Sequence, residues 1–221
     1  MFQIHARALL VCTLVTCTAA VVTAARTEYN LLANGSFEKA AAPDDPKQAG
    51  TLQDLQDRKI RYGDYDSYEI KGSLCKDWFG YEKRNAGATV SLDPEVKREG
   101  KVSLTARGRA MHCGAITHVQ PPSNRARYRI SFWYRTSPSL DRGLFAVFFY
   151  DVPRVELCNT VLPRATEWTR FEKVFTVNYP DQIKTDFTVV LSLDRSRADD
   201  AQIWFDDVRV EMLSPDGVAG R

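Results

Sequence analysis

The amino-acid sequence predicts an all-β protein, built as a β-sandwich or jelly roll. Most of the chain from Trp78 onward divides into short segments in which apolar and polar residues alternate. Turn-forming residues separate these segments at intervals of roughly 10 to 20 residues, and helical periodicity is scarce. Many short strands of this kind are typical of two packed antiparallel sheets.

Residues 1–25 have the layout of a secretory signal peptide. Residues 8–22 are uncharged and mostly apolar, and small residues at 22–25 offer a cleavage site. The apolar run is shorter than the ~20 residues that span a bilayer, so we expect a secreted, periplasmic or cell-surface protein without a membrane span. Residues 14–17 loosely resemble a bacterial lipobox, which makes a lipoprotein anchored through Cys17 the alternative.

The remainder is expected to form one β-sandwich domain over residues 26–213, followed by a flexible tail at 214–221. Residues 39–76 are polar, contain prolines and lack alternation, so they predict a long loop or insertion with a short helix at 51–60. A first strand is expected at 29–38, broken by a turn at Asn34-Gly35. Further strands are expected at 88–92, 101–107, 115–120, 128–135, 143–150, 169–177, 185–193 and 202–212.

The net charge argues against one class of partner, and the cysteines limit the possible disulfides. The 221 residues carry 30 Lys and Arg against 28 Asp and Glu, and this net charge of +2 argues against a nucleic-acid partner. Basic residues cluster at 107–109 and 125–129, where a solvated surface is the simplest interpretation. Cys75, Cys113 and Cys158 remain after signal removal, so one disulfide with one free thiol is conceivable without an assigned pairing.

Five segments, taken together and in order, resemble the carbohydrate-binding modules with a galactose-binding-domain-like jelly roll. The segments are N-G-S-F-E at 34–38, E-G-K-V-S-L at 99–104, Y-R-I-S-F-W-Y-R at 128–135, W-T-R-F at 168–171 and W-F-D-D-V at 204–208. The resemblance spans Leu32 to Val208 and implies that fold together with a carbohydrate ligand. The insertion at 39–76 departs from the family pattern, because the strand that begins at Trp78 is delayed.

The last predicted strand contains a carboxylate on its apolar face. Side chains alternate across a sheet, and one face is expected to be buried. That face carries Trp204, Asp206, Val208, Val210 and Met212. A buried carboxylate needs a cation or several hydrogen-bond donors, and an Arg or Lys partner would serve.

The resemblance implies a structural calcium ion at this carboxylate. The ligands it implies are the side chains of Glu38 and Asp206 and the backbone carbonyls of Ser36 and Lys101. An all-oxygen set suits a hard cation such as calcium. Asp207 is the competing carboxylate if the strand faces the other way.

A sugar site would combine aromatic platforms with polar groups that satisfy hydroxyls. Trp133, Trp168 and Trp204 are expected to be packing residues, and Trp78 also has a core interpretation. The candidate ligand contacts are Trp78, Tyr81, Tyr65, Tyr68, Tyr150 and Asp151.

No catalytic residues are predicted. His112 and Cys113 are adjacent, so on a strand they would point to opposite faces, and no catalytic sequence motif is present. We therefore expect a non-catalytic protein that binds a polysaccharide or glycan, alone or beside a separate catalytic or envelope protein. A protein-interaction or envelope-structural module is the first alternative, and a polysaccharide lyase or hydrolase is the second.

Overall fold

The computed structural model describes residues 30–42, 44–57, 68–83, 87–149, 156–178 and 186–215. These residues form one helix and ten strands, and every strand pairing is antiparallel. The predicted all-β jelly-roll sandwich is therefore confirmed. The predicted signal peptide at 1–25 and residues 216–221 of the predicted tail lie outside the described part of the chain. None of the helices described is long and apolar enough to span a membrane.

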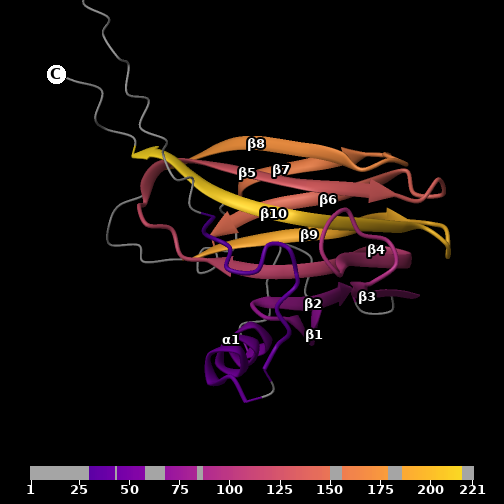
Figure 1. The fold of residues 1–221 in the computed structure, drawn as a ribbon, viewed down its shortest axis with the longest axis horizontal. Helices are drawn as coiled ribbons and strands as arrows, with labels where there is room; N and C mark the ends of the chain where they lie inside the picture. The colour runs from indigo at the N-terminus through magenta and orange to yellow at the C-terminus, as the bar shows by residue number, and fades with distance from the viewer. Residues whose placement is uncertain are drawn as a thin grey trace, which may run out of the picture.

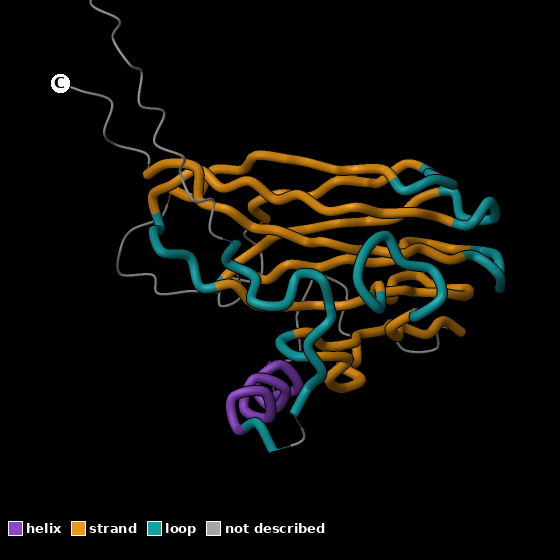
Figure 2. Tube along the Cα trace, in the orientation of Figure 1, coloured by secondary structure: helices purple, strands orange, loops and turns teal. Residues whose placement is uncertain are grey.

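The strands form two layers that share β4 (Figures 1 and 2). We call the layer β7-β6-β9-β4-β2-β1 sheet A and the layer β3-β4-β10-β5-β8 sheet B. The elements are α1 (Pro46–Asp57), β1 (Tyr68–Cys75), β2 (Trp78–Lys83), β3 (Gly87–Asp93), β4 (Ser103–Val119), β5 (Arg125–Thr136), β6 (Arg142–Phe149), β7 (Glu156–Pro163), β8 (Thr169–Asn178), β9 (Phe187–Ser196) and β10 (Gln202–Pro215).

Strand β4 joins two segments that the sequence predicted as separate strands. Its first part pairs with β3 and β10 in sheet B, and its second part pairs with β2 and β9 in sheet A. Gly108 lies between the two parts with φ of 112°, a conformation that other residues rarely adopt. A Cβ there would also lie only 2.7 Å from the carbonyl oxygen of Gly87. Glycine thus allows one strand to cross from one sheet to the other.

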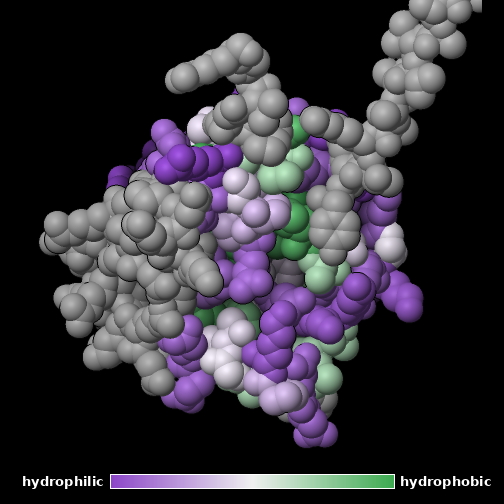
Figure 3. Space-filling view, turned by 90° about the vertical axis from the view of Figure 1, so that its left-hand side faces the viewer, coloured by the Kyte–Doolittle hydropathy of each residue, from purple (hydrophilic) through white to green (hydrophobic). Residues whose placement is uncertain are grey.

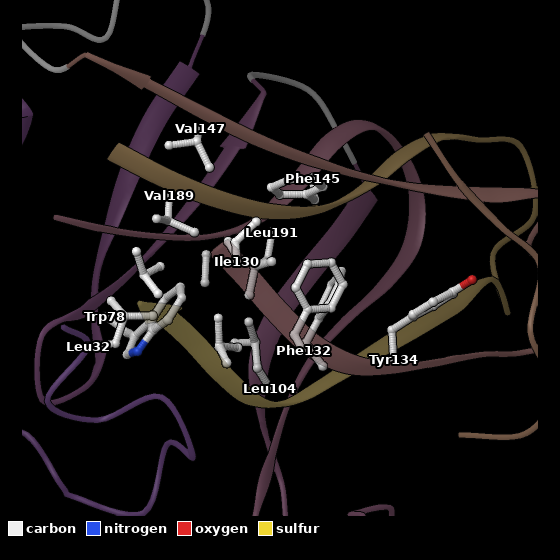
Figure 4. Packing of buried hydrophobic residues seen from close by; sticks show 14 of the residues in the cluster. Leu32, Trp78, Leu104, Ile130, Phe132, Tyr134, Phe145, Val147, Val189 and Leu191 are labelled. Carbon is white, nitrogen blue, oxygen red and sulfur yellow. The ribbon is translucent and has the colours of Figure 1, made fainter. Parts of the chain in front are cut away.

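The core between the sheets is built on the predicted inner face of β5. Tyr128, Ile130, Phe132 and Tyr134 are all buried, as their alternation predicted (Figure 4). The Phe132 ring lies 5.0 to 5.8 Å from three other rings, those of Phe145, Phe171 and Phe205. Aromatic pairs at this distance each contribute about 0.5–1.5 kcal/mol beyond the burial of their area.

The prediction of a first strand at 29–38 is wrong, because the described residues of this segment form no strand. Its described residues, from Asn30 onward, form turns that run beside β10, where Leu31 N–H donates to Val210 O at 2.8 Å and Val208 N–H donates to Gly35 O at 2.8 Å. A Cβ on Gly35 would lie 1.8 Å from the Val208 carbonyl oxygen. The close approach of two backbones explains the glycine at position 35.

The insertion contains more regular structure than predicted. Helix α1 begins at Pro46, whereas the sequence predicted a helix at 51–60. The Asp45 side chain caps it by accepting from Lys47 N–H at 3.0 Å and Gln48 N–H at 3.3 Å. An Asp followed by Pro is a helix start signal that the sequence analysis passed over. Strand β1 follows and pairs with β2.

Helix α1 covers part of the outer face of sheet A. Leu55 on α1 is fully buried and belongs to a second apolar cluster with Ile70, Phe79, Tyr81, Ile116, Ala146 and Val190. In Figure 1 the helix lies beside β1 and β2 at the lower edge of the sandwich. This part of the face is therefore filled by side chains and offers no open groove.

The first half of the last strand buries the opposite face from the one that the sequence predicted. The pairing of β10 with β5 shifts between Asp206 and Arg209, and Asp207 has φ of 49°. This β-bulge inserts an extra residue and reverses the alternation. The core-facing residues are consequently Ile203 and Phe205 before the bulge and Val208 and Val210 after it.

Three residues assigned to that buried face therefore need correction. Trp204 and Asp206 are buried, but they point out of sheet B, opposite to the core-facing Phe205. Met212 is 37% exposed. Trp204 contacts Asp93 at the end of β3. The segment between β3 and β4, drawn in front of β10 in Figure 1, contacts Asp206 through its backbone amides.

Candidate binding site

Two of the predicted aromatic contacts, Trp78 and Tyr81, are not available to a ligand. The Trp78 side chain is fully buried, its Nε1–H donates to Asn34 O at 3.0 Å, and its ring packs 5.0 Å from Phe37. Tyr81 belongs to the second apolar cluster and is 5% exposed. A ring buried in the protein cannot stack on a sugar, so both residues are corrected to core positions.

The other predicted contacts are not placed. Tyr65, Tyr150 and Asp151 lie outside the described residues. Tyr68 begins β1, but its side chain also lies outside the described part.

Of the remaining tryptophans, which were expected to be packing residues, Trp204 is buried, whereas Trp133 and Trp168 are only half-buried and lie outside the apolar core clusters. Trp204 is 9% exposed and its Nε1–H donates to Asp93 Oδ2 at 2.8 Å. The Arg98 guanidinium lies 4.0 Å from the centre of the Trp133 ring, and Trp133 and Trp168 are half-buried. Arg98 occupies the face of the Trp133 ring that a sugar would need.

Two of the residues predicted to hold calcium, Glu38 and Asp206, bond to one loop, the segment between β3 and β4 that contains Lys101. Glu38 Oε1 accepts from Lys101 N–H at 2.7 Å and from Val102 N–H at 3.2 Å. Asp206 Oδ2 accepts from Arg98 N–H at 3.0 Å and from Glu99 N–H at 3.2 Å. The buried Asp206 carboxylate thus has several backbone amides as donors, in place of the Arg or Lys side chain that was the alternative.

The two carboxylates differ in how many of their oxygens accept amides, since both oxygens of Asp206 do so. Both amides bond to Glu38 through Oε1 alone, and the donor set of two carboxylates and two carbonyls suits calcium. Within the described residues, no group of three or more His, Cys, Asp or Glu side chains could hold a metal ion. The calcium set needs only two such side chains, so it stays a prediction.

Burial decides the ionisation of Asp206. Loss of solvent raises the pKa of its carboxyl, and the amides of Glu99, Arg98 and Asp207 offset that rise only in part. The Asp207 charge raises the pKa further.

A polar hollow lies at one end of the sandwich, between the β5–β6 and β9–β10 loops. Its volume is about 530 Å³, the size of a small-molecule site. The lining is Ser139, Leu140, Asp141, Arg142, Asp194, Arg195, Ser196, Arg197 and Ala198. We call this site the end hollow.

A buried carboxylate anchors the end hollow. Asp194 on β9 is 5% exposed and lies opposite His112 on β4 in the strand register. Asp194 Oδ1 is 3.0 Å from His112 Nδ1, although the two atoms are not aligned as a hydrogen bond, and Asp194 Oδ2 is 3.4 Å from Arg142 Nε. Asp194 therefore holds Arg142, whose side chain is 41% exposed, at the wall of the hollow.

The backbone next to Asp194 is unusual. Arg195 has φ of 47°, in the left-handed region that arginine rarely adopts. Such conformations cluster at ligand sites, and here the turn presents Arg195 and Arg197 to solvent while Asp194 and Ser196 stay buried. The end hollow thus combines three guanidinium groups with two carboxylates and two hydroxyls. These groups can donate to and accept from the paired hydroxyls of a sugar.

Sequence analysis missed the end hollow, although Asp194 is a signal for it. This charged residue follows the apolar run of β9 and is buried. A buried carboxylate needs partners, which points to a polar site. The role of Arg142 could not be predicted from the sequence, because its neighbour Asp194 is identified only once β6 and β9 are paired.

Comparisons with known proteins identify the fold. No protein-family model matches the sequence, and no curated protein matches it either. A putative sugar-binding protein from Bacteroides thetaiotaomicron is similar in structure at a TM-score of 0.51 and 9% identity, over 83% of this chain and 100% of that protein. A Stig cyclase from Fischerella is similar at a TM-score of 0.51 and 13% identity, over 84% of this chain and 97% of the cyclase.

Carbohydrate-binding modules are also among the structural neighbours. A xylan-binding domain from Paenibacillus barcinonensis matches at a TM-score of 0.49 and 15% identity, over 86% of this chain and 99% of that domain. In two matches to larger proteins this chain spans only 23% and 21% of their length. At these identities the likeness establishes the shared sandwich fold alone.

Proposed function

We propose that the protein is a secreted, non-catalytic carbohydrate-binding protein that takes a glycan segment into the end hollow. The observation that carries the proposal is the buried Asp194 carboxylate, which holds Arg142 at the wall of an open polar hollow. A calcium ion held by Glu38, Asp206 and the carbonyls of Ser36 and Lys101 would stabilise the neighbouring loop.

The mechanism differs from the aromatic stacking expected from the sequence. Bidentate guanidinium and carboxylate groups orient sugar hydroxyls in a fixed geometry, and the rigid strand ends β6 and β9 hold them in place. Fold similarity to a putative sugar-binding protein and to carbohydrate-binding modules is consistent with this proposal.

The test is a glycan array probed with the full, folded chain, followed by titration calorimetry on the best ligand. Arg142→Ala should weaken binding at least about tenfold, because the guanidinium that contacts the ligand is removed. Arg109→Ala removes an exposed arginine outside the hollow and is the matched control. No retention of any glycan by folded protein would refute the proposal.

Two further outcomes separate the alternatives. The filled part of the outer face of sheet A favours a protein-interaction module, which would show as protein capture without glycan retention. Asp141 and Asp194 both line the end hollow, so a hydrolase would show as release of reducing sugar from the bound glycan.

A further inference from the structure

Arginines occupy most of the outer face of β5, which begins at the opposite end of the sandwich from the end hollow. Along this strand the core-facing residues alternate with Arg125, Arg127, Arg129 and Arg135, so these four side chains share the outer face. Arg125 lies where β5 begins, beside the last residues of β10. Figure 3 looks onto this end and shows hydrophilic side chains around a narrow apolar band.

Several arginines of this sheet face have a neighbouring carboxylate. Arg129 forms a two-point contact with Glu211, through Nε at 2.9 Å and Nη2 at 2.8 Å. Arg170 lies 3.2 Å from Glu172. These pairs leave little net charge on the middle of sheet B.

Arg125 and Arg127 have different neighbours. Both are exposed, and their partners in β8 are the exposed neutral residues Asn178 and Thr176. Two residues on the same strand face at a two-residue spacing have Cα atoms about 6.6–6.8 Å apart. The start of β5 therefore presents two guanidinium groups beside one amide and one hydroxyl. We call these four residues the β5 arginine surface.

We infer that the β5 arginine surface binds an anionic polysaccharide, with each guanidinium taking a carboxylate or sulfate group of the chain. The inference rests on the proposed carbohydrate function, because that function supplies the class of ligand. Guanidinium groups bind carboxylate and sulfate-like oxygens through two parallel hydrogen bonds. Thr176 and Asn178 supply groups that hydrogen-bond to sugar hydroxyls.

A polymer fits this surface better than a small anion. The two arginines lie side by side on a sheet and do not surround a cavity. One small anion would therefore contact both only weakly, whereas a polymer with repeated charges can place one charged group at each arginine. A nucleic acid fits less well, because the chain carries a net charge of only +2.

The test is calorimetric titration of the full chain with three probes at 20 mM and 200 mM NaCl. The probes are polygalacturonate, dextran sulfate and uncharged dextran, so that carboxylate, sulfate and neutral polymers are compared. We expect binding of one or both anionic polymers and a steep loss of affinity at the higher salt, because exposed charges are screened. Comparable binding of uncharged dextran to this surface would overturn the inference.

Two double variants with the same change in charge locate the site. Arg125→Gln with Arg127→Gln should weaken binding of the anionic polymer at least about tenfold. Arg170→Gln with Arg209→Gln removes two exposed arginines that already have carboxylate partners, and it should change affinity less than about threefold. Equal loss in both variants would show a non-specific charge effect and overturn the inference.

A variant in the end hollow separates binding at the hollow from binding at the β5 arginine surface. Arg142→Ala should leave binding of the anionic polymer unchanged while it reduces binding of the array ligand. If glycan binding in the hollow persists but neither anionic polymer binds, the proposed function stands and the β5 arginine surface is refuted. Tighter binding of duplex DNA than of either polysaccharide would also refute the assignment to carbohydrate.

Discussion

Asp194 on β9 lies directly opposite His112 on β4, with 3.0 Å between His112 Nδ1 and Asp194 Oδ1. The pair joins the two strands at the point where sheet A reaches the end hollow. On its other oxygen Asp194 meets Arg142 of β6. One carboxylate thus connects three adjacent strands of sheet A and fixes the guanidinium that we propose to contact the ligand.

Replacing Asp194 should damage the site as well as the fold. Asp194→Asn removes the charge that holds Arg142, so we expect glycan affinity to fall about tenfold and unfolding free energy to fall by about 1–3 kcal/mol. Calorimetry and urea denaturation measure the two effects. Asp199→Asn is the control, because Asp199 is 84% exposed and lies outside the hollow. Unchanged affinity in folded Asp194→Asn would argue against the hollow.

The Asp206 carboxylate should make stability depend on pH. Burial raises its pKa in the folded protein, so protonation favours the folded state. This contribution is fully present below about pH 4, the pKa of an exposed Asp, and is lost as pH rises through the raised folded pKa. Asp206→Asn should flatten the dependence over that window and cost about 1–3 kcal/mol at pH 7, since an amide cannot accept all three backbone N–H bonds.

The neighbouring residue provides the control for that measurement. Asp207 has φ of 49°, which Asn tolerates well, and its side chain contacts Arg209 near the surface. Asp207→Asn should therefore change unfolding free energy by less than about 0.5 kcal/mol. A loss equal to that of Asp206→Asn would show that charge on the bulge, rather than the buried hydrogen bonds, determines stability.

Regular alternation could be predicted from the sequence, and local exceptions to it could not. The inner face of β5 was predicted correctly because Tyr128 to Tyr134 alternate without interruption. The bulge at Asp206 and Asp207 was missed because its residues look like any alternating strand until β10 is paired with β5. The crossing of β4 was missed because Gly108 reads as a turn signal in the sequence.

The candidate site was less predictable than the fold. The aromatic residues Trp78 and Tyr81 were selected for their chemistry, but packing places them in the core. The end hollow joins residues 139–142 with residues 194–198, and only the pairing of β6 with β9 brings the two segments together. The sequence alone could not predict that these two segments are neighbours.

Gly108 should tolerate no side chain. A Cβ at this position would lie 2.7 Å from Gly87 O and 3.0 Å from Ala88 Cα, on a backbone whose φ of 112° already disfavours other residues. We expect Gly108→Ala to lower the unfolding free energy by more than about 1 kcal/mol in urea denaturation. Gly50→Ala is the matched control, because nothing lies within 4 Å of the added atom and Gly50 is in α1. That variant should be neutral or slightly stabilising.

The three cysteines should be unreactive while the protein is folded. Cys75, Cys113 and Cys158 are buried free thiols, which excludes a disulfide among them. Burial raises the pKa of Cys75 and of Cys113 to about 12. At pH 8 only roughly one such thiol in ten thousand is a thiolate, the reactive form. In a chain that lacks residues 1–25, and with them Cys12 and Cys17, a chromogenic thiol reagent should therefore titrate three groups in denaturant and almost none in buffer.

Chelation tests the calcium prediction. Glu38 and Asp206 both bond to the loop between β3 and β4, so a cation shared by their carboxylates would tie that loop to the N-terminal segment and to β10. If calcium binds there, EDTA should lower the Tm by several degrees, and excess calcium should restore it. Glu38→Gln should lower the Tm in calcium and abolish the response to EDTA. An unchanged Tm on chelation of the wild-type protein would mean that the backbone amides alone satisfy both carboxylates.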